Sequence, residues 1–78
     1  MAFKPGNLSL FKVRKILEHR GCKCIRENKG HEKYCRPDLL RPITIQNHID
    51  PVPEFIVKQI MRTLKLTNAD MERILKEI

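Results

Sequence analysis

The sequence lacks the segments that a membrane-embedded or secreted protein requires. No stretch approaches the roughly 20 consecutive apolar residues of a membrane-spanning helix, and the N-terminus has no apolar core of a signal peptide. Three cysteines cannot form a fully paired disulfide framework. We therefore expect a soluble cytoplasmic protein whose thiols stay reduced.

Acidic residues are scarce in the first half of the chain. Through Arg36 there are ten Lys and Arg but only three Asp and Glu, so this part has a net charge of +7. From Pro37 onward there are six of each, and the net charge is zero. Concentrated positive charge favours a polyanion, nucleic acid being the commonest. An acidic protein surface or an anionic membrane would satisfy the same charge, so charge alone leaves these three partners open.

The length of 78 residues suits one domain with a thin core. Pro5-Gly6-Asn7 is a cluster of structure-breaking residues, so residues 1–7 are expected to be flexible. We assign residues 1–8 to a short N-terminal lead-in. Residues 9–78 then form the single domain. Neither an internal repeat nor a low-complexity segment interrupts it.

Apolar residues at helical spacing predict three helices. The first begins at a cap, Asn7 or Ser9, and ends at Gly21. The second spans Glu54 to Leu66, after a proline-rich loop. The third begins at Thr67-Asn68-Ala69-Asp70, a variant of the capping box with Asp as its fourth residue.

Three short segments between the first two helices predict β-strands: Cys22–Glu27, His31–Arg36 and Ile43–Gln46. Asn28-Lys29-Gly30 predicts the turn between the first two, because Asn and Gly tolerate positive φ angles. The order α-β-β-β-α-α predicts a two-layer α+β fold, in which helices cover one face of a three-stranded antiparallel sheet. The other face, with its Lys and Arg residues, is where we expect a ligand.

His31 stands where this hairpin enters its second strand, surrounded by cations. An imidazole ordinarily titrates near neutral pH, so His31 is a candidate acid-base group facing a polyanion. Its local spacing alone fits a polar residue on an exposed turn equally well. Tyr34 could stack on a base or pack against the helices.

The three cysteines and His31 could in principle gather around zinc. However, Cys22-x-Cys24 is not the usual Cys-x2-Cys spacing, and no second close pair accompanies it. Small buried side chains explain Cys22, Cys24 and Cys35 better. We therefore expect neither a metal nor another cofactor.

Four segments occur in an order that resembles a known family. They are Lys15-Ile16-Leu17-Glu18 with Gly21, Lys29-Gly30-His31-Glu32-Lys33-Tyr34, Arg41-Pro42-Ile43-Thr44-Ile45 with His48, and Ile60-Met61-Arg62-Thr63-Leu64. Together they resemble the HicA family, the small toxin component of HicA–HicB toxin–antitoxin systems. The resemblance extends from Leu10 to Met71.

The resemblance implies a fold like that of double-stranded-RNA-binding domains and the activity of a metal-independent mRNA interferase. In that family a Gly-Ser-His motif opens the second strand, and its histidine is required for RNA cleavage. Gly30 and His31 match the motif, but no serine separates them, so the turn is one residue shorter. His48 matches a second histidine after the third strand.

This resemblance implies His31 as the catalytic residue. The residues expected to contact RNA are Lys29, Gly30, Lys33, Tyr34, Arg36 and His48. The implied partners are mRNA and an acidic HicB-like antitoxin, with no membrane, and the chain would be a monomer until the antitoxin binds. A non-catalytic nucleic-acid-binding or protein-interaction module on the same fold is the alternative. The last helix could complete the core or dock on a partner.

Overall fold

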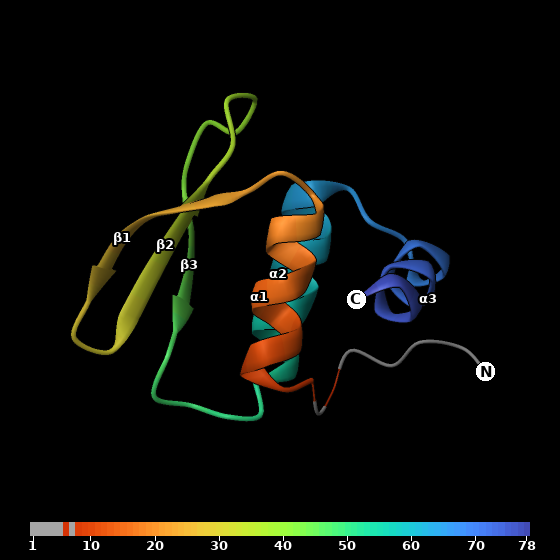
Figure 1. Ribbon diagram of the computed structural model, residues 1–78, viewed down its shortest axis with the longest axis horizontal. Coiled ribbons are helices and arrows are strands. Elements are labelled where there is room, and N and C mark those ends of the chain that lie inside the picture. Colours follow the sequence, from red (N-terminus) through yellow and green to blue (C-terminus); the bar gives the residue numbers. More distant parts are fainter. Residues whose placement is uncertain (1–5, 7) are drawn as a thin grey trace.

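The computed structural model, which describes residue 6 and residues 8–78, confirms the predicted α+β fold and its order of elements (Figure 1). The elements are α1 (Leu10–His19), β1 (Lys23–Asn28), β2 (His31–Cys35), β3 (Ile43–Gln46), α2 (Glu54–Leu64) and α3 (Asn68–Glu77). None of these helices has the length and apolar character needed to cross a membrane.

Helix α1 forms because a cap and an apolar stripe agree on its position. The Ser9 side chain accepts a hydrogen bond from the Lys12 backbone N–H at 3.2 Å, which satisfies one free N–H of the first turn. The other predicted cap, Asn7, lies outside the described residues. Gly21, with φ of 80°, follows the helix and turns the chain toward the sheet. The buried stripe consists of Leu10, Val13, Ile16 and Leu17.

A short break separates α2 from α3, and the end of α2 lies two residues earlier than the sequence predicted. Lys65 has φ of 57° and caps α2, so the helix ends at Leu64 rather than Leu66. The predicted capping box of α3 is confirmed. The Thr67 side chain accepts from the Asp70 N–H at 3.1 Å, and the Asp70 carboxylate accepts from the Thr67 N–H at 2.9 Å.

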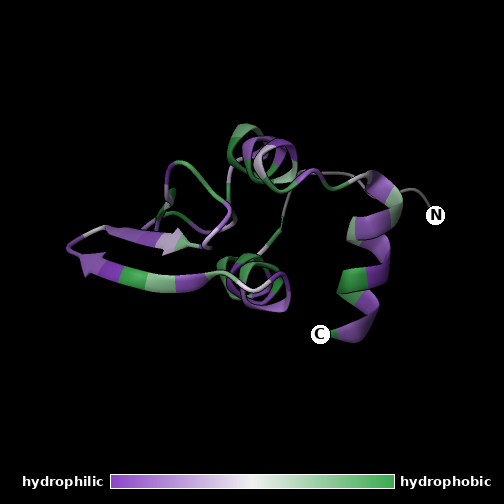
Figure 2. Cartoon of the chain, turned by 90° about the horizontal axis from the view of Figure 1, so that it is seen from above, coloured by the Kyte–Doolittle hydropathy of each residue, from purple (hydrophilic) through white to green (hydrophobic). Residues whose placement is uncertain are grey.

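The three strands form an antiparallel sheet in the order β1-β2-β3. Helices α1 and α2 lie side by side against one face of it, and α3 lies beyond them, away from the sheet (Figures 1 and 2). Met71 and Ile74 of α3 are each only 1% exposed and belong to the same apolar core as α1 and α2. The last helix therefore completes the core.

Leu8, assigned to the lead-in, belongs to the packed part of the chain. It is buried, and its carbonyl accepts a hydrogen bond from the Val52 N–H at 2.8 Å. The rest of that lead-in, apart from residue 6, lies outside the described residues. The domain thus begins at least one residue earlier than predicted, because a neighbouring loop segment pairs with Leu8.

Only one of the three cysteines is a buried small residue. Cys22 is buried, which raises the pKa of its thiol, whereas Cys35 is half-buried and Cys24 is exposed. Every residue of β1 is exposed, and its hairpin with β2 projects beyond the helices (Figure 1). The pattern Cys22-x-Cys24-Ile25 predicts a half-buried first strand, and this prediction is wrong.

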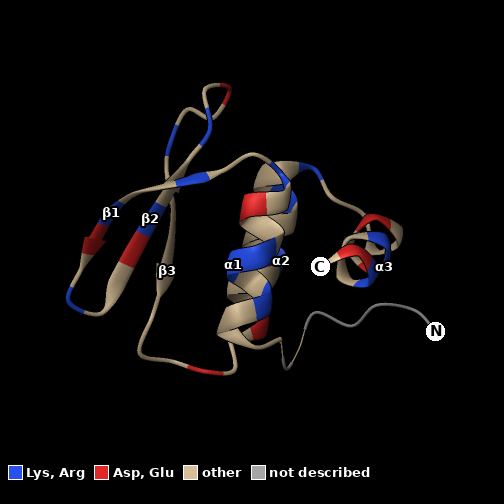
Figure 3. Cartoon of the chain, viewed as in Figure 1, with Lys and Arg blue, Asp and Glu red and all other residues tan. Residues whose placement is uncertain are grey.

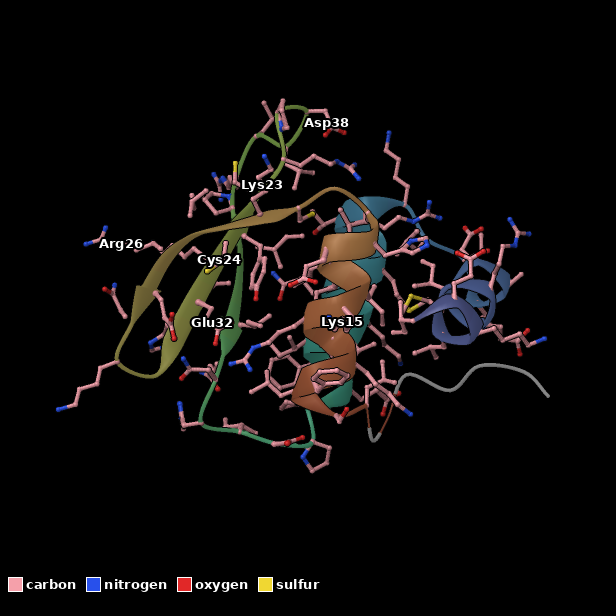
Figure 4. The ribbon with its side chains drawn as sticks, viewed as in Figure 1. Lys15, Lys23, Cys24, Arg26, Glu32 and Asp38 are labelled. Atoms are coloured by element: carbon pink, nitrogen blue, oxygen red, sulfur yellow. The ribbon has the colours of Figure 1, made fainter. Side chains whose placement is uncertain are left out.

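A buried carboxylate fastens β2 to α1. Glu32 is only 3% exposed and points from β2 toward the helices (Figure 4). The Arg14 guanidinium contacts both of its oxygens, with Nε 3.1 Å from Oε1 and Nη2 against Oε2. The Tyr34 hydroxyl also donates to Oε1, at 2.9 Å. Together these three side chains fix the position of β2, and therefore of its first residue His31, relative to α1.

This network shifts the pKa values of Glu32 and Tyr34 in opposite directions. The Arg14 hydrogen bonds lower the pKa of Glu32 below its ordinary value, against the opposing effect of burial, and the Tyr34 hydroxyl lowers it further. Burial, and then the hydrogen bond to Glu32, raise the pKa of Tyr34. Glu32 is thus an anion and Tyr34 a neutral donor at physiological pH.

Arg14→Met should lower the free energy of unfolding at pH 7 by roughly 2 to 3 kcal/mol, because it leaves a buried charge without its partner. The folded pKa of Glu32 is the lower one, so this stabilisation is present above the ordinary value of about 4.3 and is lost as pH falls through the folded value. Urea denaturation at pH 7 and at pH 3 measures both effects.

Lys12→Met, an exposed change on the same helix, is the control and should alter stability by no more than about 0.5 kcal/mol. Equal losses in the two variants at pH 7, or an Arg14→Met deficit that does not shrink at pH 3, would contradict the role given to Glu32.

Candidate histidine site and nucleic-acid interface

His31 is an exposed residue at the inner end of a tight turn. It pairs with Asn28 on β1 and with Gln46 on β3, so the two flanking strands hold its backbone from both sides. Gly30 precedes it with φ of 87°, a conformation that glycine adopts without strain. The short turn therefore delivers His31 directly into the sheet, with its side chain in solvent.

The sequence-predicted His48 lies beside this turn. Its Nδ1 is 3.2 Å from the Gly30 carbonyl oxygen, which also accepts from the Asn47 N–H at 3.0 Å. A carbonyl oxygen can only accept, so Nδ1 carries the proton in this contact, and Nε2 of the neutral ring keeps its lone pair. The Gly30 carbonyl thus orients the ring and sets its tautomer.

Gly30 is needed here for space as well as for its backbone angle. A Cβ at this position would lie 3.3 Å from Nδ1 of His48 and 3.7 Å from Cε1. The ring of His48 would therefore have to shift by a few tenths of an ångström to admit a side chain. The positive φ and this close approach both favour glycine before His31.

The two imidazole rings face one another in a T-shaped arrangement. Their centroids are 6.3 Å apart and their planes make an angle of 75°. Both residues are exposed, so a ligand has access to both. Two imidazoles at this separation can act on two different atoms of one bound group, one ring accepting a proton and the other donating one.

The sheet face turned away from the helices carries cations without carboxylates. Register places Arg26 beside Lys33, with Lys23 further along on the same side. Glu27 and Glu32 pair with each other on the opposite side. We call this surface the open face; it consists of Lys23, Arg26, Asn28, His31, Lys33, Cys35, Thr44 and Gln46.

The cations of the open face are available to a ligand. Among the described residues, no ion pair involves Lys23, Arg26 or Lys33. Figure 3 shows positive charge along the hairpin, and Figure 4 shows Arg26 extending away from the protein. Lys29 is exposed at the tip of the same hairpin. Unpaired cations on a sheet attract a phosphate backbone.

Two residues predicted to contact RNA are engaged elsewhere. Tyr34 is only 4% exposed, because it alternates onto the helix-facing side of β2, so it is not available to stack on a base. Arg36 donates from Nη1 to the Arg20 carbonyl at 2.9 Å and from Nη2 to Asp38 at 2.9 Å. Arg36 therefore links the end of α1 to the β2–β3 turn. The burial of Tyr34 shows that its predicted stacking on a base is wrong, whereas the predicted RNA contact of Arg36 stays a prediction.

Lys23 and Arg26 are the open-face cations that the predicted site omitted. An irregularity between Cys24 and Arg26 shifts the register of β1, which brings Arg26 opposite Lys33. Strict alternation from Lys23 would have turned Arg26 toward the helices. A β-bulge has no reliable signal in one sequence, so the pairing could not be foreseen.

A cavity of about 420 Å³ opens between β3 and α2, and His31 contributes to its wall. Its other lining residues are Arg41, Pro42, Ile43, Thr44, Gln46, Ile56, Gln59, Ile60 and Thr63. Neither Arg41 nor the lining residues of α2 belonged to the predicted site. The cavity depends on how α2 packs beside β3, which sequence spacing does not specify.

Within the described part of the chain, no three His, Cys, Asp or Glu side chains are grouped to hold a metal ion. No family model, curated protein or solved structure matches the chain.

Gly30→Ala and Gly21→Ala form a matched pair for testing the His48 contact. Both glycines have positive φ, so each alanine should cost about 1 to 2 kcal/mol of unfolding free energy. Only the Cβ at position 30 meets His48; at position 21 the nearest atom is Cδ of Arg36, at 3.7 Å. The ¹⁵N chemical shifts of the His48 ring should therefore change in Gly30→Ala and stay unchanged in Gly21→Ala. Identical His48 chemical shifts in the two variants would refute the contact.

Proposed function

We propose that this protein is an endoribonuclease that cleaves mRNA without a metal, as the toxin of a HicA-like toxin–antitoxin pair. The observation that carries the proposal is the exposed pair of His31 and His48 at the border of the open face. The cations bring the phosphate backbone to the sheet, and the imidazoles supply acid-base groups. The order of motifs from Leu10 to Met71 agrees with this activity.

The reaction follows from the two rings. One imidazole takes the proton of the ribose 2′-hydroxyl, whose oxygen attacks the adjacent phosphorus and forms a 2′,3′-cyclic phosphate. The P–O5′ bond breaks, and the other ring donates a proton to the leaving 5′-oxygen. In this proposal Lys29, at the tip of the hairpin, and Lys33, on the open face with His31, stabilise the extra negative charge of the transition state.

The shortened motif is compatible with this geometry. Gly30 leads directly into His31, and the freed volume beside the turn holds the ring of His48. In this proposal the exposed open face is also the surface that an acidic HicB-like antitoxin covers, which would block RNA. The free chain acts as a monomer in the cytoplasm.

A non-catalytic RNA-binding module is the second candidate function. Lys23, Arg26 and Lys33 form the cationic part of the open face without either histidine. RNA binding could therefore persist in a chain that does not cleave. Separate measurements of cleavage and of affinity distinguish the two functions.

His31→Ala should reduce the rate of RNA cleavage about 100-fold or more, since a positioned acid-base group contributes roughly 10²- to 10⁴-fold. His48→Ala should cause a loss in the same range. His19→Ala is the matched control, because His19 lies at the end of α1 and pairs with Glu77 at 2.6 Å. The measurement is single-turnover cleavage of a labelled mRNA with EDTA present.

Expression in bacteria adds a second measurement. The native chain and His19→Ala should arrest growth, whereas His31→Ala should not. The catalytic proposal fails if the folded native chain neither cleaves RNA nor arrests growth, or if His31→Ala remains as active as the native chain.

Removing cations from the open face should weaken RNA binding in a salt-dependent way. Each phosphate contact with single-stranded RNA contributes about 0.7 to the slope of log K against log salt. We expect Lys23→Ala, Arg26→Ala and Lys33→Ala each to reduce that slope by up to about 0.7. Lys76→Ala, an exposed change on α3, should leave the slope unchanged. Fluorescence anisotropy with a labelled RNA at several salt concentrations measures it, and equal slopes would place RNA on another surface.

A further inference from the structure

The cavity between β3 and α2 has the composition of a site for a flat, partly polar group. We call it the β3–α2 groove. Buried Ile43 and Ile60 form an apolar base, and the exposed Thr44, Gln46, Gln59 and Thr63 stand around it. Its volume of about 420 Å³ falls in the range of small-molecule sites, roughly 300 to 1,000 Å³.

The edge of β3 adds backbone groups to this groove. The Asn47 N–H donates to the Gly30 carbonyl at 3.0 Å, so the peptide groups of Asn47, Ile45 and Ile43 face β2. The peptide groups of Thr44 and Gln46 alternate with these and therefore face away from β2. Because β3 is an edge strand, no further strand of the sheet lies on that side. Among the described residues no hydrogen bond uses these outward groups, and Thr44 and Gln46 both line the groove. The groove thus combines backbone N–H and C=O groups with two side-chain amides.

The groove is continuous with the histidine site. His31 lines it, and Gln46, which pairs with His31 across the sheet, lines it as well. A phosphate held at His31 therefore places its own nucleotide at the mouth of the groove. Arg41, also in the lining, offers a cation for the adjoining backbone.

We propose that the β3–α2 groove binds a nucleobase of the RNA strand whose phosphate lies at His31. This inference rests on the proposed RNA-binding function and assigns the base-reading part of the site. The isoleucine side chains contact the flat faces of the base, because no Phe, Tyr or Trp occurs among the lining residues. The amides of Gln46 and Gln59 each present a donor and an acceptor to its polar edge, the pattern with which glutamine reads bases.

An extended peptide added to the edge of β3 is the rival occupant. Strand β3 has only four residues, and Pro42 precedes it, so only Thr44 and Gln46 present outward peptide groups within the strand. Short edges and a nearby proline are features that discourage strand addition. The structure therefore favours a base over a peptide.

Binding of uncleavable trinucleotides to the full chain tests the proposal. Trinucleotides with 2′-O-methyl groups lack the attacking hydroxyl, and each is compared with a version whose central base is absent. We expect the Gln59 side-chain amide and the Ile60 methyl resonances to shift with the base present and to remain unshifted with the abasic version. Resonances of Arg26 and Lys33 should respond to both, because they report the phosphates.

Two substitutions on α2 provide a matched comparison. Thr63→Phe fills the groove, whereas Lys58→Phe places the same ring on the exposed side of the helix, where Lys58 pairs with Glu54. Thr63→Phe should reduce affinity for the base-containing trinucleotide about tenfold, to that of the abasic one, as expected for loss of one base contact. Lys58→Phe should not. Gln59→Ala should also diminish the differences in affinity among the four bases.

Three results would overturn the inference. These are equal groove shifts with the base-containing and abasic trinucleotides, equal affinity losses in both Phe variants, or a groove that responds only to an extended peptide. Failure of the proposed function is recognised separately. Base-dependent groove binding without RNA cleavage removes the catalytic proposal and leaves the groove assignment. Absence of any trinucleotide binding removes both.

Discussion

The buried contact between Arg14 and Glu32 is the interaction on which the rest of the structure depends. Strand β2 is the middle strand of the sheet, so its position determines where both neighbouring strands lie. Glu32 ties that strand to α1, and the Tyr34 hydroxyl supports the same carboxylate. A charge buried in this way is destabilising without its partner, so the contact favours the one arrangement of β2 and α1 in which Arg14 meets Glu32.

This constraint also explains the division of the sheet into two chemically different sides. Alternation along β2 sends Glu32 and Tyr34 toward the helices, and it sends His31 and Lys33 to the open face. Slipping the register by one residue would bury the cations and expose the carboxylate. The network that stabilises the fold therefore also determines which charged side chains lie on the open face.

The histidine site depends on the backbone of the short turn before His31. Gly30 provides a positive φ, an acceptor for His48 and the space for its ring. The proposed chemistry depends on this turn more than on any single long-range contact. The β3–α2 groove, which we propose binds a nucleobase, lies next to it, because α2 packs beside the edge strand β3.

The sequence by itself determined the order of elements, the cap at Thr67 and a hairpin turn directly before His31, and it offered Asn7 and Ser9 as alternative caps of α1. These features depend on residues within a few positions of one another, so local spacing and turn chemistry are sufficient to predict them. The sequence assigned Asn28 to the turn, whereas the structure pairs Asn28 with His31 at the end of β1. The sequence also identified the surplus of cations in the first 36 residues. It did not identify which of them share a surface.

Only the tertiary structure decided what depends on residues distant in the chain. It buried Tyr34 against Glu32, engaged Arg36 with Arg20 and Asp38, and brought His48 to Gly30. It also placed Arg26 beside Lys33 through a shift in register, and formed a groove from β3 and α2. Each of these outcomes is set by packing and strand register between separate elements, and no local pattern in the sequence encodes that information.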